Sequence, residues 1–200
     1  MDKNKKYLAL DLELNNAPDG STPNPKIIQV GVAVGSASQS KSEWLVKHWF
    51  VKVNEPIYPF ITELTGITND DVRNKGMSHY EIGKELSNLI TEHDVFANPV
   101  TWGGGDSTEL KKEFETNGIH FPHFGRRWVD VKTWYVLHML SKGKSPKGGL
   151  SSAMGEFKLK FDGQAHRADV DAMNTLELFF HILSRQQMLN NIVDTARNVK

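Results

Sequence analysis

Two carboxylates at alternate positions of an apolar segment are the first residues that could do chemistry. Asp11 and Glu13 lie in the run from Tyr7 to Leu14, where every second residue is a leucine. Strand side chains alternate between two faces, so both carboxylates project from the face opposite the leucines. Buried ionised carboxylates are costly unless a cation neutralises them, and this run contains no basic residue. The pair indicates a divalent metal site, since Mg²⁺ prefers oxygen ligands; the alternative is a solvent-facing strand end.

A third carboxylate, Asp106, follows three consecutive glycines at 103–105. Glycines allow the backbone to approach a ligand or another segment closely. With Glu109 three residues later, Asp106 also resembles a helix N-cap with its capping-box partner. Taken alone, the cap is the favoured interpretation, although a residue at a strand-to-helix junction can also point into a site.

The last group is His166 and Asp171, which are five residues apart. On one continuous helix they would be separated by about 500°, and so would lie roughly 140° apart. They converge only if His166 lies in a loop before the helix and Asp171 in its first turns, an arrangement that Gly163 favours. An ordinary surface histidine and an aspartate stabilised by the helix dipole are the alternatives. Asp169 competes with Asp171, and amphipathicity does not separate the two.

The periodicity of apolar residues predicts the elements that must position these groups. Alternation predicts a strand at 7–14, and runs rich in apolar or β-branched residues predict strands at 27–34 and 44–53, with a loop at 15–25. Further on, the pattern predicts a helix around 82–90, a strand at 95–102, a helix after 106, a strand at 128–131 and a helix at 131–140. A basic loop at 142–149 and helices at 150–158 and 168–183 complete the order. This order predicts an α/β fold with a mixed central sheet and helices against it.

Length and composition limit the class of protein. The 200 residues suit a single domain over 1–200, with a core at about 7–184 and a C-terminal tail at 185–200. With 24 basic and 24 acidic residues, the chain is not a generic basic nucleic-acid coat protein. The absence of cysteine excludes disulfides, thiolate zinc sites and cysteine nucleophiles. No apolar run has the roughly 20 residues of a membrane helix, so we expect a cytoplasmic protein without a membrane partner.

Together the three groups resemble the DnaQ-like exonucleases of the DEDDh type, within the ribonuclease-H-like superfamily. Five flanking segments agree in order with that family, namely 24–31, 61–68, 102–106, 128–131 and 149–168. The resemblance covers about residues 7–180. Leu14 departs from the family's usual threonine, and Asp169 stands where many members have an apolar residue. The family spacing selects Asp171 as the ligand, and the histidine subtype is favoured because no tyrosine stands at the alternative spacing.

The resemblance implies a ribonuclease-H-like fold and a 3′→5′ exonuclease that releases nucleoside 5′-monophosphates from single-stranded DNA or RNA 3′ ends. It implies two divalent ions, Mg²⁺ or Mn²⁺, a general base and two substrate contacts. The implied metal ligands are Asp11, Glu13, Asp106 and Asp171, the base is His166, and the substrate contacts are Leu14 and Arg167. A catalytically silent binding module on the same fold is the alternative. An endonuclease of the wider superfamily is disfavoured, since those enzymes tend to place the second carboxylate on a helix.

Overall fold

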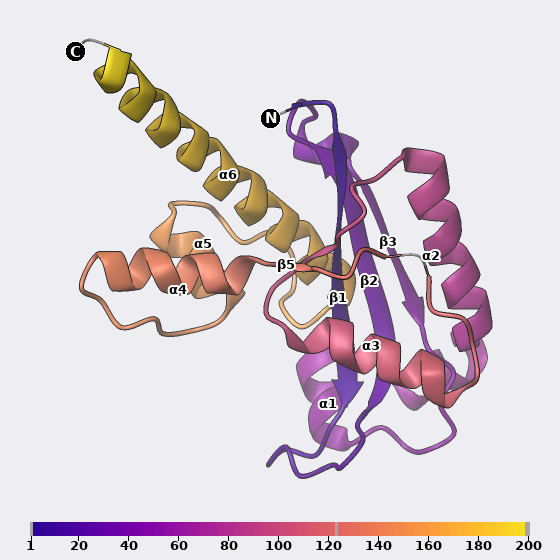
Figure 1. Cartoon of the computed structure of the whole chain (residues 1–200). Coiled ribbons are helices and arrows are strands. Elements are labelled where there is room, and N and C mark those ends of the chain that lie inside the picture. The colour runs from indigo at the N-terminus through magenta and orange to yellow at the C-terminus, as the bar shows by residue number, and fades with distance from the viewer. Residues whose placement is uncertain (1, 123, 199–200) are drawn as a thin grey trace.

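The computed structural model describes residues 2–122 and 124–198, within which five strands form one mixed sheet flanked by helices (Figure 1). The strands are β1 (Lys6–Asn15), β2 (Lys26–Ser36), β3 (Leu45–Phe50), β4 (Val100–Thr101) and β5 (Val129–Asp130). Their order in the sheet is β3-β2-β1-β4-β5. The first three strands pair antiparallel, whereas β4 and β5 run parallel to β1. The predicted fold class is therefore confirmed.

Helices cover both faces of the sheet. They are α1 (Pro59–Thr65), α2 (His79–His93), α3 (Gly105–Thr116), α4 (Val131–Ser141), α5 (Leu150–Glu156) and α6 (Ala168–Asn198). Two single turns, Lys41–Glu43 and Asp71–Lys75, complete the described elements. Buried residues of α2 and α3 share one core cluster with β1, and those of α4, α5 and α6 share another. Among the described residues, no helix combines the length and apolarity needed to cross a membrane.

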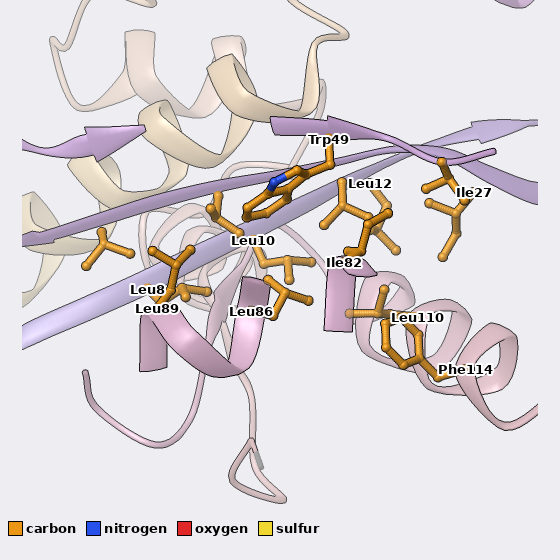
Figure 2. Packing of buried hydrophobic residues seen from close by; sticks show 14 of the residues in the cluster. Leu8, Leu10, Leu12, Ile27, Trp49, Ile82, Leu86, Leu89, Leu110 and Phe114 are labelled. Atoms are coloured by element: carbon orange, nitrogen blue, oxygen red, sulfur yellow. The ribbon is translucent and has the colours of Figure 1, made fainter. Parts of the chain in front are cut away.

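The alternation in β1 decides which face carries the carboxylates. Leu8, Leu10 and Leu12 are buried in the first cluster against α2 and α3 (Figure 2). Ala9 points the other way and packs in the cluster that contains buried residues of α6. Because side chains alternate along a strand, Asp11 and Glu13 follow Ala9 to the α6 side of the sheet. The predicted division of β1 into two faces is thus confirmed.

Three predicted boundaries were wrong. The strand predicted at 95–102 shrinks to β4, because Pro99 has no N–H to donate inside a sheet. The strand predicted at 44–53 shortens to β3. The last helix does not end near 183 but continues to Asn198, so residues 185–198 of the predicted tail are helical, while 199–200 lie outside the described residues. Its final turns extend past the other elements in Figure 1, and apolar residues such as Leu189 and Ile192 are exposed there. Because these turns do not pack on the core, the apolar stripe that predicts the helix at 168–183 does not continue through them.

Candidate active site

Asp11 and Glu13 lie where the regular pairing of β1 with β2 ends. Asp11 pairs with Gly31 and Glu13 pairs with Gln29, but Leu14 then pairs with Ile27. One residue of β2 is therefore extra at this point, which makes a β-bulge. Glu13 is nearly buried, with 9% of the residue exposed. The bulge thus interrupts the ladder directly beside the two carboxylates, and pairing resumes at Leu14 and Asn15.

The first turn of α6 rests on β2 at Gly31. A Cβ atom built on Gly31 would lie 2.0 Å from the carbonyl carbon of Ala168, so only glycine permits this approach. Next to it, the buried Gln29 accepts a hydrogen bond of 2.9 Å through Oε1 from the backbone N–H of Ala168. This bond satisfies one of the free N–H groups at a helix N-terminus. Gly31 and Gln29 together fix the distance of α6 from the sheet and the direction of this helix, which carries Asp171.

His166 lies in the loop before α6, as its spacing required. Its φ of 63° is in the left-handed region, which few residues other than glycine adopt. Its backbone N–H donates a hydrogen bond of 2.9 Å to Oδ2 of Asp171, and the N–H of Asp171 donates to the carbonyl of Arg167 in the first turn. Ligand atoms of Glu13, His166 and Asp171 all lie within 4.8 Å of one another. The predicted convergence of His166 with Asp171 is present in the structure.

Asp106 is not the N-cap that the capping-box pattern predicted. Gly104 occupies the cap position without a side-chain hydrogen bond, and Asp106 lies inside the first turn of α3. Glu109 instead forms an ion pair of 3.8 Å with Lys112. The glycines that precede α3, with Gly103 at a φ of 102°, allow the helix to begin early. The carboxylate of Asp106 is consequently free to face the end of β1.

Burial raises the pKa of each of the four carboxylates, and the charges of neighbouring carboxylates add to this effect. Burial raises the pKa of Asp11 well above its usual range, and the charges of the other three carboxylates add to the effect. Burial, followed by the charges of Asp171 and Asp106, raises the pKa of Glu13 to about 8. The pKa of Asp106 rises to about 7 because of burial, although hydrogen bonds with its own backbone and that of Leu12 oppose the shift. Burial also raises the pKa of Asp171, against the hydrogen bond from the backbone of His166.

A cavity of about 440 Å³ opens over these groups. Asp11, Glu13, His166 and Asp171 line it together with aromatic and serine side chains, and no lysine or arginine is among its described lining residues. Crowded carboxylates with raised pKa values and no compensating cation suit a hard divalent ion, because Mg²⁺ and Mn²⁺ prefer oxygen ligands. The donor set therefore fits the metals that the sequence predicted.

The two predicted substrate contacts do not line this cavity. Leu14 packs at the edge of the first core cluster, on the far side of β1 from Glu13. Arg167 forms an ion pair of 3.3 Å with Asp169, whose Oδ2 lies within hydrogen-bond distance, at 3.0 Å, of Nδ1 of His48 on β3. Asp169 is thus turned toward β3, which separates it from Asp171. Sequence reasoning missed Gln29 and His48, because only the strand register brings them to α6.

We expect the metal-free protein to lose stability as the pH rises from about 5 to about 8. The folded state holds protons on Glu13 and Asp106 that the unfolded chain releases near its ordinary carboxyl pKa values. The unfolded state binds fewer protons in this interval, so a rising pH favours it, and the loss levels off above the folded-state pKa of about 8. Urea unfolding in EDTA at several pH values measures the slope. Added Mn²⁺ should reverse it, Glu13→Gln should flatten it, and a stability that rises with pH would contradict the argument.

Comparison with known proteins shows consistent similarity to nucleases. The sequence profile of RNase_T, described as an exonuclease, matches residues 8–179. The chain is 26% identical over 180 residues to Small RNA degrading nuclease 3 of Arabidopsis thaliana, covering 88% of this chain and 20% of that protein. It is 31% identical over 134 residues to ERI1 exoribonuclease 2 of Danio rerio, covering 58% of this chain and 23% of that protein. The chain thus spans about a fifth of the length of these curated relatives.

Solved structures share the fold at low sequence identity. The nuclease domain of 3′hExo, a DEDDh family member bound to rAMP, superposes with a TM-score of 0.76 at 16% identity, over 92% of this chain and 94% of that chain. Cell-death related nuclease 4 gives a TM-score of 0.76 at 14% identity, over 92% of this chain and 65% of that one. Exonuclease I of E. coli in complex with a dT13 oligonucleotide gives 0.66 at 17% identity, over 96% and 44%.

Proposed function

Because the chain belongs to the RNase_T exonuclease family of nuclease hydrolases, we propose that it is a metal-dependent 3′→5′ exonuclease that removes single nucleotides from a nucleic-acid strand. The observation that carries the proposal is the cavity in which Asp11, Glu13, His166 and Asp171 converge. Asp106 lies close enough for its charge to act on Asp11 and Glu13. A catalytically silent binding module, the alternative, would have no need for four carboxylates that destabilise one another.

Asp11, Glu13, Asp106 and Asp171 would hold two divalent ions. When bound, such ions neutralise charge on the transferred phosphoryl group and make a water molecule more acidic. The carboxylates would hold such ions from a strand and from the first turns of two helices. Because burial and neighbouring charges raise the pKa of Glu13 to about 8, binding of the ions near neutral pH would displace a proton from this group.

His166 would act as the general base. Imidazole exchanges protons near neutral pH, and the ring stands at the mouth of the cavity beside Glu13 and Asp171. The ring takes a proton from water as the water oxygen attacks the phosphorus of the terminal phosphodiester. The bond from phosphorus to the 3′ oxygen of the penultimate nucleotide breaks, that oxygen is protonated, and a nucleoside 5′-monophosphate leaves.

Single-stranded 3′ ends of DNA or RNA are the proposed substrates. Support comes from relatives of the same fold: one was solved with a dT13 oligonucleotide, and another is a 3′-exonuclease solved to show 3′-end specific recognition of histone mRNA stem-loop. The test uses 5′-labelled single-stranded DNA and RNA oligonucleotides with Mg²⁺ or Mn²⁺. We expect a ladder that shortens from the 3′ end and is abolished by EDTA. Internal cuts would indicate an endonuclease, and intact strands with metal bound would favour the binding module.

Gly31→Ala should lower the rate of 3′-end hydrolysis by about a hundredfold, because a displacement of about 1 Å in a catalytic group has this effect. The new methyl group meets backbone atoms of Ala168, so α6 must move away from the sheet and carry Asp171 with it. Overpacking of this kind also costs about 1–3 kcal/mol of unfolding free energy. Gly155→Ala is the matched control, since a Cβ there meets nothing within 4 Å. Equal activity of the two variants would contradict the role of Gly31.

A further inference from the structure

A second cavity, of about 790 Å³, lies along α3 outside the catalytic cavity. One wall is the exposed side of α3 from Ser107 to Glu115, and the other is formed by residues of the segment that leads to β5, including Phe124, Arg126 and Trp128. We call this cavity the α3 groove. It begins at Ser107, the residue directly after Asp106, and follows the helix for roughly 12 Å. One end of the groove therefore lies at the first turn of α3, the turn that also carries Asp106 of the catalytic site.

The groove carries an excess of positive charge. Lys111, Lys112 and Arg126 line it, against the single carboxylate of Glu115. The ion pairs of the two lysines, at 3.7 Å to Glu115 and 3.8 Å to Glu109, join exposed side chains and are weak in water. The whole chain has a net charge of zero, so this excess is local. The lysines and the arginine are available to a polyanion.

Aromatic rings stand beside these cations. Phe121, Phe124 and Trp128 line the groove and are all partly exposed. The ring of Phe124 lies 5.8 Å from that of Phe121 and 5.3 Å from that of Trp128, in edge-to-face contact. All three pack against the first core cluster, which holds them in place. Rigid aromatic rings next to cations are the combination that binds single-stranded nucleic acid, with bases stacked on rings and phosphates on cations.

We propose that the α3 groove binds the part of a single-stranded nucleic acid that lies 5′ of the nucleotide being removed. The inference rests on the proposed exonuclease function, because it places the terminal phosphodiester at Asp106 and Asp11. The strand then continues from Ser107 along α3, past Lys111 and Lys112 on one wall and Arg126 on the other. Recognition is independent of sequence, since the rings and cations contact base faces and phosphates. Paired bases do not offer their faces to the rings, so an unpaired strand is required.

The test compares two triple variants on a long and a short substrate. The groove variant combines Lys111→Gln, Lys112→Gln and Arg126→Gln. The control variant removes two lysines and one arginine from exposed positions outside the groove, and combines Lys52→Gln, Arg73→Gln and Lys84→Gln. The long substrate is dT10, and the short one is the 4-nitrophenyl ester of thymidine 5′-monophosphate, which is too small to reach the groove. We expect the groove variant to raise the KM for dT10 at least tenfold and to leave hydrolysis of the ester unchanged. The control variant should change neither.

Salt dependence gives a second readout. Each phosphate contact of a single strand contributes about 0.7 to the slope of log affinity against log salt, so three lost cations should reduce that slope by about two. If the wild type, the groove variant and the control variant hydrolyse dT10 with the same KM and the ester at the same rate, the groove proposal is overturned and the exonuclease function stands. If the wild type hydrolyses neither substrate, the function fails, and fluorescence anisotropy of labelled dT10 then decides the groove alone. Competition by a poly-glutamate peptide as strong as that by dT10 would contradict a site for nucleic acid.

Discussion

Asp11→Asn is expected to lower the rate of 3′-end hydrolysis by about a thousandfold, comparable to the loss of a key electrostatic group in other active sites. Asp11 is the carboxylate whose pKa responds to all three of the others, which places it at the centre of the cluster. An amide has nearly the same shape but no charge, so the variant loses a metal ligand without a change in packing. The measurement is the initial rate on labelled oligonucleotides at saturating Mn²⁺.

The same substitution should make the metal-free protein more stable. Asparagine removes one member of a crowded set of carboxylates and thereby relieves both repulsion and the cost of burying a charge. Thermal unfolding at pH 8 in EDTA should show a higher midpoint for Asp11→Asn than for the wild type. Asp169→Asn is the matched control, because Asp169 faces Arg167 and His48 instead of the cavity. A less stable metal-free Asp11→Asn protein, or a rate within tenfold of the wild type, would count against a central metal-binding role.

His166→Asn should lower kcat by about 10²–10⁴-fold, the usual contribution of a general base. Asparagine is chosen because it tolerates the left-handed conformation at this position better than alanine, and it cannot accept a proton near neutral pH. The backbone N–H that donates to Asp171 is retained, so the loop should keep its shape. The loss of rate then reports the imidazole itself.

The pH–rate profile distinguishes this role from a structural one. At saturating Mn²⁺, the wild-type rate should fall toward acidic pH, where a protonated base cannot accept a proton, and this acidic limb should be absent in His166→Asn and in His166→Ala. Mn²⁺ affinity, measured by calorimetry, should stay within about threefold of the wild type, since carboxylates hold the ions in the proposed mechanism. A large loss of Mn²⁺ affinity would make His166 a ligand, and an unchanged acidic limb would exclude it as the base.

Local patterns in the sequence were sufficient to predict those parts of the fold and the site that depend only on residues close together in the chain. The leucine alternation placed Asp11 and Glu13 on one face of a strand, and the angle between His166 and Asp171 required a loop before a helix. Both features are present in the structure. The mixed sheet with helices against it also followed from the order of periodic segments.

Contacts between segments that are far apart in the chain could not be predicted from such local patterns. Gln29 and Gly31 matter because the β1–β2 register puts them beside Glu13 and Asp11, and because α6 then rests on them. Nothing in the local pattern of the second strand distinguishes them from other buried residues. At Asp106 the local pattern was misleading. Its sequence resembles a capping box, but α3 begins at Gly105, so Asp106 lies inside the helix.

The packing of α6 on Gly31 determines when the site is completed during translation. Asp11 and Glu13 belong to the first strand, whereas Asp171 and His166 belong to the last helix and the loop before it. Domains emerge from the ribosome N-terminus first, so the sheet exists as a partial, open form before α6 is made. The emerging chain lacks two of its site residues, His166 and Asp171, until the start of α6 has been synthesised. The order of elements along the chain therefore keeps the site incomplete for most of the time that the domain is being made.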